Sequence, residues 1–181
     1  MKPNFTRFIQ PKQNSKTEKN MPSFEQEAFE KYKEISRQIT DPKTLSTLRK
    51  LFERTYTLQE LLDWLHPKLQ WSRGEITRYI NPLEILKYRK GRCGEYSILY
   101  TALCLAHGYR ARIILDMTDH VWTEVWNPAQ KRWMHIDPSE KKINDPKMYE
   151  RDWRKKLAKI YAFENGKAED VAKNYKFKRK L

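Results

Sequence analysis

Cysteine is scarce in this chain, which has only Cys93 and Cys104 among its 181 residues. If both lie on one helix they are about three turns apart, too far to bridge each other. No two cysteines have the CxxC spacing of a zinc site, and two cysteines do not make a disulfide framework. We therefore expect no disulfide, no bound metal and a reducing, cytoplasmic environment.

Long hydrophobic runs are also lacking. The opening stretch "MKPNFTRFIQPKQNSK" has no apolar segment of signal-peptide length, and nothing later approaches the length that spans a bilayer. We therefore expect no membrane insertion. Residues 1–22 are polar, carry Lys and Pro and show no periodicity, which is typical of a flexible basic arm.

Acidic residues are outnumbered, since 37 Lys and Arg stand against 23 Asp and Glu and give a formal charge of +14. Such a surface attracts nucleic acid or another acidic partner. Because the basic residues are spread along the whole chain, solubility is the favoured explanation of the charge. The densest basic run, "KFKRKL", ends residues 172–181, which we expect to form a solvated basic tail.

The sequence predicts a single domain over residues 23–181, with helices in its first part. Within the helical part, residues 23–80, three helix starts are indicated by capping residues: Ser23, Asp41 with Pro42, and Thr57 with Glu60. The second of these helices is expected over residues 41–56, with Leu51 and Phe52 on its apolar face.

The catalytic core is expected over residues 81–171. A short helix from Pro82 to Lys87 precedes a longer, nearly all-apolar helix that ends at Gly108. The hydrophobic period then changes to two, which predicts strands within residues 109–117, 120–126, 132–137 and 160–163. The sequence therefore predicts an α+β fold in which a central helix packs on a small antiparallel sheet.

Cys93 is the first candidate functional residue, because it begins the apolar helix "CGEYSILYTALC". Free N–H groups and the helix dipole favour an anionic thiolate at that position. Gly91 and Gly94 allow an unusual backbone and a close approach of substrate. Cys104 lies in mid-helix among apolar neighbours and is expected to be an inert core thiol. From this stretch alone, a core role for Cys93 remains the favoured alternative.

A nucleophilic thiol needs a base and a group that orients the base. A hairpin with its tip at Ala129-Gln130 would set Trp122 opposite Asp137 and His120 diagonal to Asp137 on the same face. Asp137 could then hold the His120 imidazole. His135 shares that face and is the alternative base, whereas no histidine spacing resembles a metal motif.

The stretches "GRCGEYS", "TDHVWTEV" and "WMHIDPSE" resemble, in this order, the motifs of the cytoplasmic peptide:N-glycanases, which belong to the transglutaminase-like superfamily. The resemblance covers residues 81–171. It implies a papain-like cysteine proteinase core in which Cys93 is the nucleophile, His120 the base and Asp137 the orienting carboxylate. The four-cysteine zinc hairpin that this family carries ahead of the nucleophile has no counterpart in the sequence.

The resemblance also implies an activity. Enzymes of this family cleave the N-linked glycan from Asn of misfolded glycoproteins through a thioester, without a cofactor. Five residues match positions of the family that face the substrate: Trp122, Glu124, Arg112, Trp133 and, as an aromatic beside the oxyanion site, Trp71.

Two groups of alternatives stay open at the level of sequence. One is a cysteine enzyme that acts on another amide, either as a hydrolase or protease or as a transglutaminase that passes the acyl group to a Lys amine. The other is a nucleic-acid-binding relative of the fold, which would suit the charge of +14 but would have no chemical reason to keep Cys93, His120 and Asp137 together.

Overall fold

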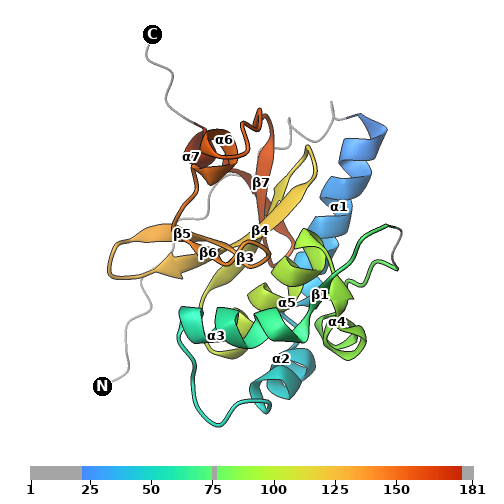
Figure 1. The fold of residues 1–181 in the computed structure, drawn as a ribbon, viewed down its shortest axis with the longest axis vertical. Coiled ribbons are helices and arrows are strands. Elements are labelled where there is room, and N and C mark those ends of the chain that lie inside the picture. The colour runs from blue at the N-terminus through green and yellow to red at the C-terminus, as the bar shows by residue number, and fades with distance from the viewer. Residues whose placement is uncertain (1–21, 75–76, 177–181) are drawn as a thin grey trace.

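The structure, a computed structural model, describes residues 22–74 and 77–176 (Figure 1). The helices are α1 (Ser23–Gln38), α2 (Pro42–Arg49), α3 (Leu58–Leu65), α4 (Pro82–Tyr88), α5 (Cys93–Ala106), α6 (Met148–Arg151) and α7 (Ala172–Tyr175), with a 3-10 turn at His66–Lys68. The strands are β1 (Gln70–Trp71), β2 (Lys90–Gly91), β3 (Ala111–Asp116), β4 (His120–Asn127), β5 (Arg132–Asp137), β6 (Lys142–Ile143), β7 (Ile160–Glu164) and β8 (Lys167–Asp170).

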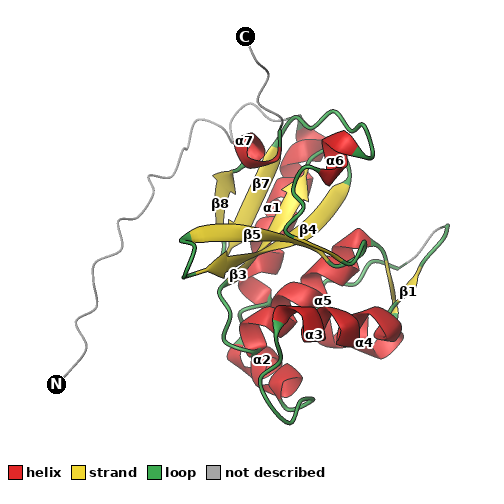
Figure 2. Ribbon diagram, turned by 60° about the vertical axis from the view of Figure 1, so that its left-hand side comes forward, coloured by secondary structure: helices red, strands yellow, loops and turns green. Residues whose placement is uncertain are grey.

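Six of the strands form one antiparallel sheet in the order β6-β5-β4-β3-β7-β8, and β1 pairs with β2 in parallel. Figures 1 and 2 both show α2, α3 and α4 gathered around α5, whereas α6 and α7 lie at the other end of the molecule, beyond the sheet. The predicted α+β class, with a central helix on an antiparallel sheet, is confirmed. None of the described helices is both long and apolar enough to cross a lipid bilayer.

The predicted helix starts are largely confirmed by capping contacts. Asp41 Oδ2 accepts a hydrogen bond from Thr44 N at 2.8 Å, and Thr57 forms a capping box with Glu60. The exception is Ser23, which is the first residue inside α1 and makes no capping bond.

The predicted length of α2 is wrong, because the helix ends at Arg49 rather than continuing to residue 56. Leaving the helix lets the Phe52 ring pack against Trp64 and His107, with ring centroids 4.7 and 4.6 Å away. Leu51, expected on the apolar face, is instead 47% exposed. The helix therefore ends early, and the chain after it turns so that the Phe52 ring is buried.

α5 is enclosed from Gly94 to Cys104. Toward the sheet, Ser97 Oγ donates to Val121 O at 2.8 Å, and the hydroxyls of Thr101 and Thr123 lie 2.9 Å apart. These buried hydroxyls are satisfied by each other or by the backbone, so the helix is fixed in position on β4 as well as packed against it.

The opposite face of the sheet carries a second core, where α7 is anchored by Tyr175. The Tyr175 hydroxyl donates to Glu124 Oε1 at 2.6 Å and accepts from Trp122 Nε1 at 2.7 Å. Residues 172–176 are therefore part of the domain, unlike the solvated tail expected from the sequence. The arm expected over residues 1–22, apart from Pro22, and residues 177–181 lie outside the described residues.

We expect Tyr175→Phe to lower the free energy of unfolding by about 1–3 kcal/mol, because it removes the hydroxyl that pairs with the buried Trp122 N–H and with Oε1 of Glu124. Urea denaturation followed by circular dichroism measures this change. Tyr88→Phe is the matched control, because Tyr88 is 47% exposed and should change stability by less than about 0.5 kcal/mol. Equal effects of the two substitutions would contradict the anchoring role of α7.

Candidate active site

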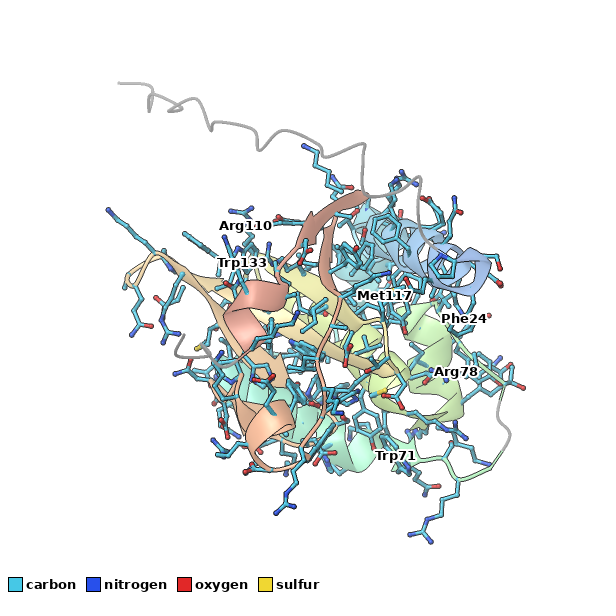
Figure 3. The ribbon with its side chains drawn as sticks, turned by 90° about the horizontal axis from the view of Figure 1, so that it is seen from above. Phe24, Trp71, Arg78, Arg110, Met117 and Trp133 are labelled. Carbon is cyan, nitrogen blue, oxygen red and sulfur yellow. The ribbon has the colours of Figure 1, made fainter. Side chains whose placement is uncertain are left out.

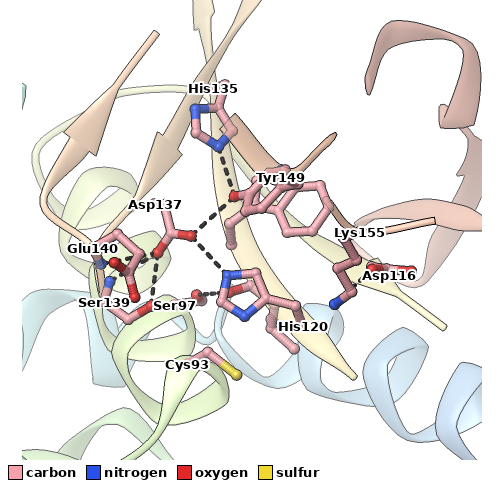
Figure 4. A network of polar contacts seen from close by, with 12 residues as sticks. Cys93, Ser97, Asp116, His120, His135, Asp137, Ser139, Glu140, Tyr149 and Lys155 are labelled. Atoms are coloured by element: carbon pink, nitrogen blue, oxygen red, sulfur yellow. Dashed lines mark hydrogen bonds and ion pairs between the residues drawn. The ribbon is translucent and has the colours of Figure 1, made fainter. Parts of the chain in front are cut away.

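Cys93, His120 and Asp137 come together at one end of the sheet. Cys93 is the first residue of α5, His120 begins β4, and Asp137 ends β5. His120 Nε2 lies 2.7 Å from Asp137 Oδ2, and the second nitrogen of its ring points toward the Cys93 sulfur (Figure 4). This is the geometry of a nucleophile, a base and a group that orients the base.

The β4–β5 hairpin has the predicted register. Thr123 pairs with Ile136, so the next step along the strands sets Trp122 opposite Asp137 and leaves His120 diagonal to it. The loop differs, because Asn127 and Arg132 form the last pair and four residues make the turn instead of two. Alternation along two strands was therefore sufficient to find the partner of His120.

The Asp137 carboxylate has no exposed surface, and both of its oxygens accept hydrogen bonds. Oδ1 accepts from Ser139 N and Oγ (3.0 and 2.8 Å) and from Glu140 N (3.2 Å). Oδ2 accepts from His120 and from the Tyr149 hydroxyl (2.9 Å). Burial alone would raise the pKa of Asp137, but these bonds and the charge of His120 lower it below the usual value. Asp137 is therefore an anion that orients His120.

His120 is held in its charged form. Burial would lower its pKa, but the hydrogen bonds to Asp137 and Cys93, together with the negative charge of both groups, raise the pKa to about 9. The imidazolium is therefore the dominant form at neutral pH. A positive charge therefore lies beside Cys93, at the N-terminal end of α5.

His135, the alternative base, does not face Cys93. Its Nε2 lies 2.7 Å from the hydroxyl of Tyr149, which itself donates to Asp137, so Nε2 carries the proton (Figure 4). Burial lowers the pKa of His135 to about 4, and the ring is neutral. Tyr149, which belongs to α6, was not identified from the sequence, because no local pattern indicates which side chain packs behind a sheet.

Gly91 and Gly94 are needed for a reason other than the expected one. Neither is among the described glycines with a positive φ. A Cβ on Gly91 would lie 2.4 Å from the Cβ of Glu95, and one on Gly94 would lie 2.8 Å from Arg78 Nη2 and 3.0 Å from Tyr32 Oη. These glycines thus make room for side chains of the protein itself at the first turn of α5.

A cleft of about 1060 Å³ opens at Cys93 and His120. We call it the Cys93 cleft. Its rim carries three exposed aromatic side chains, Phe24, Trp71 and Trp153, and its wall includes Tyr32 and Arg78. Trp153 packs edge-on against His120, with ring centroids 4.9 Å apart. The same cleft therefore combines exposed aromatic surface with the thiol.

Of the five residues predicted to contact substrate, Trp71 lines the Cys93 cleft and the other four do not. Three of these four residues are almost fully buried on the face of the sheet that points away from α5: Trp122, Glu124 and Arg112. The second core covers them there. Figure 3 shows Trp133 on the opposite side of the molecule from Phe24, Arg78 and Trp71.

Arg112 and Glu124 form a buried ion pair, with Nε 2.7 Å from Oε2, and the Arg112 guanidinium lies 3.9 Å from the Trp133 ring centroid. Trp122 and Glu124 lie on the same face of β4 as His120, as the alternation of side chains predicted. Only the first residues of β4, at His120, open to the Cys93 cleft. Along the remainder of the strand, α6 and α7 cover this face. On this face Arg112 contacts both Glu124 and Trp133, and Trp122 packs in the second core.

Among residues 22–74 and 77–176, no group of three or more His, Cys, Asp or Glu side chains is arranged to hold a metal ion.

Comparison with known proteins assigns the family. Residues 33–138 match the Transglutaminase-like superfamily. The chain belongs to this superfamily. Two similar curated proteins are both named peptide-N(4)-(N-acetyl-beta-glucosaminyl)asparagine amidase. The protein from Gallus gallus is 46% identical over 101 residues, which are 56% of this chain and 16% of the relative. The protein from Homo sapiens is 40% identical over 126 residues, 70% of this chain and 19% of the relative.

The chain thus spans less than a quarter of the length of these relatives. Among solved structures, a Rad4-Rad23 complex bound to a 6-4 photoproduct UV lesion is similar, with a TM-score of 0.65 and 14% identity. The match covers 82% of this chain and 46% of that one. At this identity the likeness concerns the fold.

We expect iodoacetamide at pH 6 to alkylate Cys93 and not Cys104. Cys93 lines the cleft beside a protonated His120, whereas Cys104 has no exposed surface and burial raises its pKa far above the usual value. Peptide mass spectrometry locates the label, and Cys93→Ala should take up none. Equal labelling of Cys104 would contradict the assignment.

We expect the free energy of unfolding to fall as the pH is lowered from 6.5 to 4. In this range the unfolded chain protonates His135 at its ordinary pKa of 6.5, while the folded chain keeps it neutral with a pKa of about 4. The unfolded state thus binds more protons, and the loss is on the order of 3 kcal/mol for this residue. Urea denaturation across the range measures it.

His135→Gln is the control for this pH dependence, because the amide can still donate to Tyr149 but does not titrate. Its stability should change less with pH between 6.5 and 4 than that of the wild type. Parallel curves for the two proteins would rule out the buried neutral imidazole. The raised pKa of His120 has the opposite pH dependence. Its contribution to the free energy of unfolding is complete below pH 6.5 and is lost as the pH rises through about 9.

Proposed function

We propose that this chain is a cysteine-dependent amidase that releases N-linked glycan from Asn of unfolded glycopeptides or glycoproteins. The observation that carries the proposal is the alignment of Cys93, His120 and Asp137 at the Cys93 cleft. The names of the similar curated proteins support the substrate. A cytoplasmic location belongs to the same proposal, because the reaction needs Cys93 as a free thiol.

The first half of the reaction forms a thioester. The Cys93 thiolate attacks the side-chain carbonyl carbon of the glycosylated Asn, and the carbonyl electron pair moves to oxygen. The tetrahedral intermediate then collapses, the C–N bond breaks, and the leaving glycosylamine takes the proton that His120 carries on the nitrogen facing Cys93. The products of this half are free glycosylamine and acylated Cys93.

Water completes the reaction. Neutral His120 accepts a proton from water as the water oxygen attacks the thioester carbon, and the C–S bond then breaks to return the thiolate. The Asn side chain has become the carboxyl group of Asp. Asp137 stays ionised throughout and keeps the imidazole oriented through its 2.7 Å contact with Nε2.

The charge on Cys93 explains how His120 can serve as acid first and base second. Part of the rise in the pKa of His120 comes from the hydrogen bond and negative charge of Cys93. Acylation removes that charge, so the pKa of His120 falls after the first half. The imidazole is then a better base in the step that needs one.

The test is incubation with a denatured N-glycosylated glycoprotein in ¹⁸O-water, followed by mass spectrometry of its peptides. We expect Asn at the glycosylation site to become Asp carrying ¹⁸O. Cys93→Ala should lower the rate at least about 10⁴-fold without unfolding the protein. The matched control is Cys104→Ala, which removes the buried thiol and should leave turnover in place.

Other outcomes redirect the proposal. A thioester trapped on Cys93 from a different amide, with glycosylated Asn intact, would mean another amidase substrate. Acyl transfer to a Lys amine without ¹⁸O would mean a transglutaminase. Full activity of Cys93→Ala would contradict the mechanism altogether.

A further inference from the structure

The hydroxyl of Tyr32 lies at the N-terminal end of α5, close to Cys93. Tyr32 belongs to α1 and lines the Cys93 cleft together with Cys93 and His120. A Cβ built on Gly94 would lie 3.0 Å from Tyr32 Oη, so the hydroxyl touches the first turn of α5 at the residue that follows Cys93. A carbonyl attacked by Cys93 must lie at this same turn.

This hydroxyl has no evident structural use. Within the described residues Tyr32 makes no hydrogen bond through Oη, and its ring contact is with Phe163, 6.3 Å between centroids. Burial, and then the negative charge of Cys93, raise the pKa of Tyr32 well above its ordinary value. The phenol is therefore a neutral donor at working pH, with its proton available.

The surroundings favour a negative charge in front of that donor. Arg78 Nη2 would lie 2.8 Å from the same Cβ built on Gly94, so a guanidinium and a hydroxyl meet over the first turn of α5. Arg78 is held there by Glu95, with Nε 2.6 Å from Oε1. α5 has 14 residues, and the positive end of its dipole points the same way.

We propose that Tyr32 is a catalytic residue that donates its hydroxyl hydrogen bond to the oxyanion formed when Cys93 attacks the amide carbonyl. The phenol donates a hydrogen bond and transfers no proton, so the balance of the reaction is unchanged. Arg78 adds positive charge at the same place. The role rests on the proposed amidase function and adds a group that the sequence did not indicate; Trp71, the predicted oxyanion-side aromatic, stays at the rim.

The test compares Tyr32→Phe with wild type in two reactions. Amide cleavage passes through an oxyanion, and losing one donor should lower kcat about 10²-fold with KM changed less than about threefold. Alkylation of Cys93 by iodoacetamide forms no oxyanion and should keep its rate, which also shows that the variant is folded. Tyr88→Phe, outside the cleft, is the matched control and should leave both rates unchanged.

Two results would overturn the proposal. One is unchanged kcat in Tyr32→Phe. The other is an equal loss in amide cleavage and in alkylation, which would place the hydroxyl on the thiolate instead of the oxyanion.

The role of Tyr32 can be separated from the choice of substrate. Acylation of Cys93 by p-nitrophenyl acetate also passes through an oxyanion, and Tyr32→Phe should slow it as well. If wild type leaves glycosylated Asn intact but Tyr32→Phe is slow with the ester, the proposed function fails and the role of Tyr32 stands. If wild type cleaves the glycopeptide and the variant matches it with both substrates, the role of Tyr32 fails alone.

Discussion

The buried carboxylate of Asp137 is the constraint on which the site depends. Removing an unpaired carboxylate from water costs several kcal/mol, so its oxygens must find donors within the fold. They find them in three places: the start of β4 (His120), the turn after β5 (Ser139 and Glu140), and α6 (Tyr149). One charge therefore fixes how these segments meet. It also explains why the short helix α6 packs against His120, through the ring of Tyr149.

The two faces of the sheet contact different parts of the protein. One face of β4 binds α5 through buried hydroxyls such as Thr123, which sets the position of Cys93. The other face carries His120 at its open end and Trp122 and Glu124 under the second core. Because Cys93 and His120 are the first residues of a helix and a strand, the separation of their side chains depends on regular elements and not on loop conformation.

The sequence predicted what depends on neighbours along the chain. The helix starts at Asp41 and Thr57 follow from the capping chemistry of those side chains. The start of α5 at Cys93 and the register that joins His120 to Asp137 follow from periods of 3.6 and 2 residues. These rules say which face a residue occupies and not what covers that face. Trp122 and Glu124, which the resemblance assigned to substrate contact, have the predicted parity on β4 but are buried.

Groups that reach the site from distant segments could not be predicted in the same way. Tyr149 lies 12 residues from Asp137, and Tyr175 reaches Glu124 across 51 residues. Tyr32 comes from α1, at the other end of the chain from the hairpin. No periodic pattern links such positions, because only tertiary packing decides which element lies against which face. The sequence pattern indicated that Cys93, His120 and Asp137 lie together, but it gave no sign that Tyr149 or Tyr32 lies beside them.

The two histidines of this face show how one network assigns chemical roles. His120 and His135 are both buried and both connect to Asp137, yet the pKa of one rises to about 9 and that of the other falls to about 4. The two pKa values differ because the two rings contact the carboxylate of Asp137 in different ways. His120 touches the carboxylate directly and faces Cys93, whereas His135 reaches the carboxylate through the neutral hydroxyl of Tyr149. Direct contact with negative charge outweighs burial in the first case, and burial prevails in the second. At neutral pH His120 is therefore protonated beside Cys93, whereas His135 is neutral and is held by the hydroxyl of Tyr149.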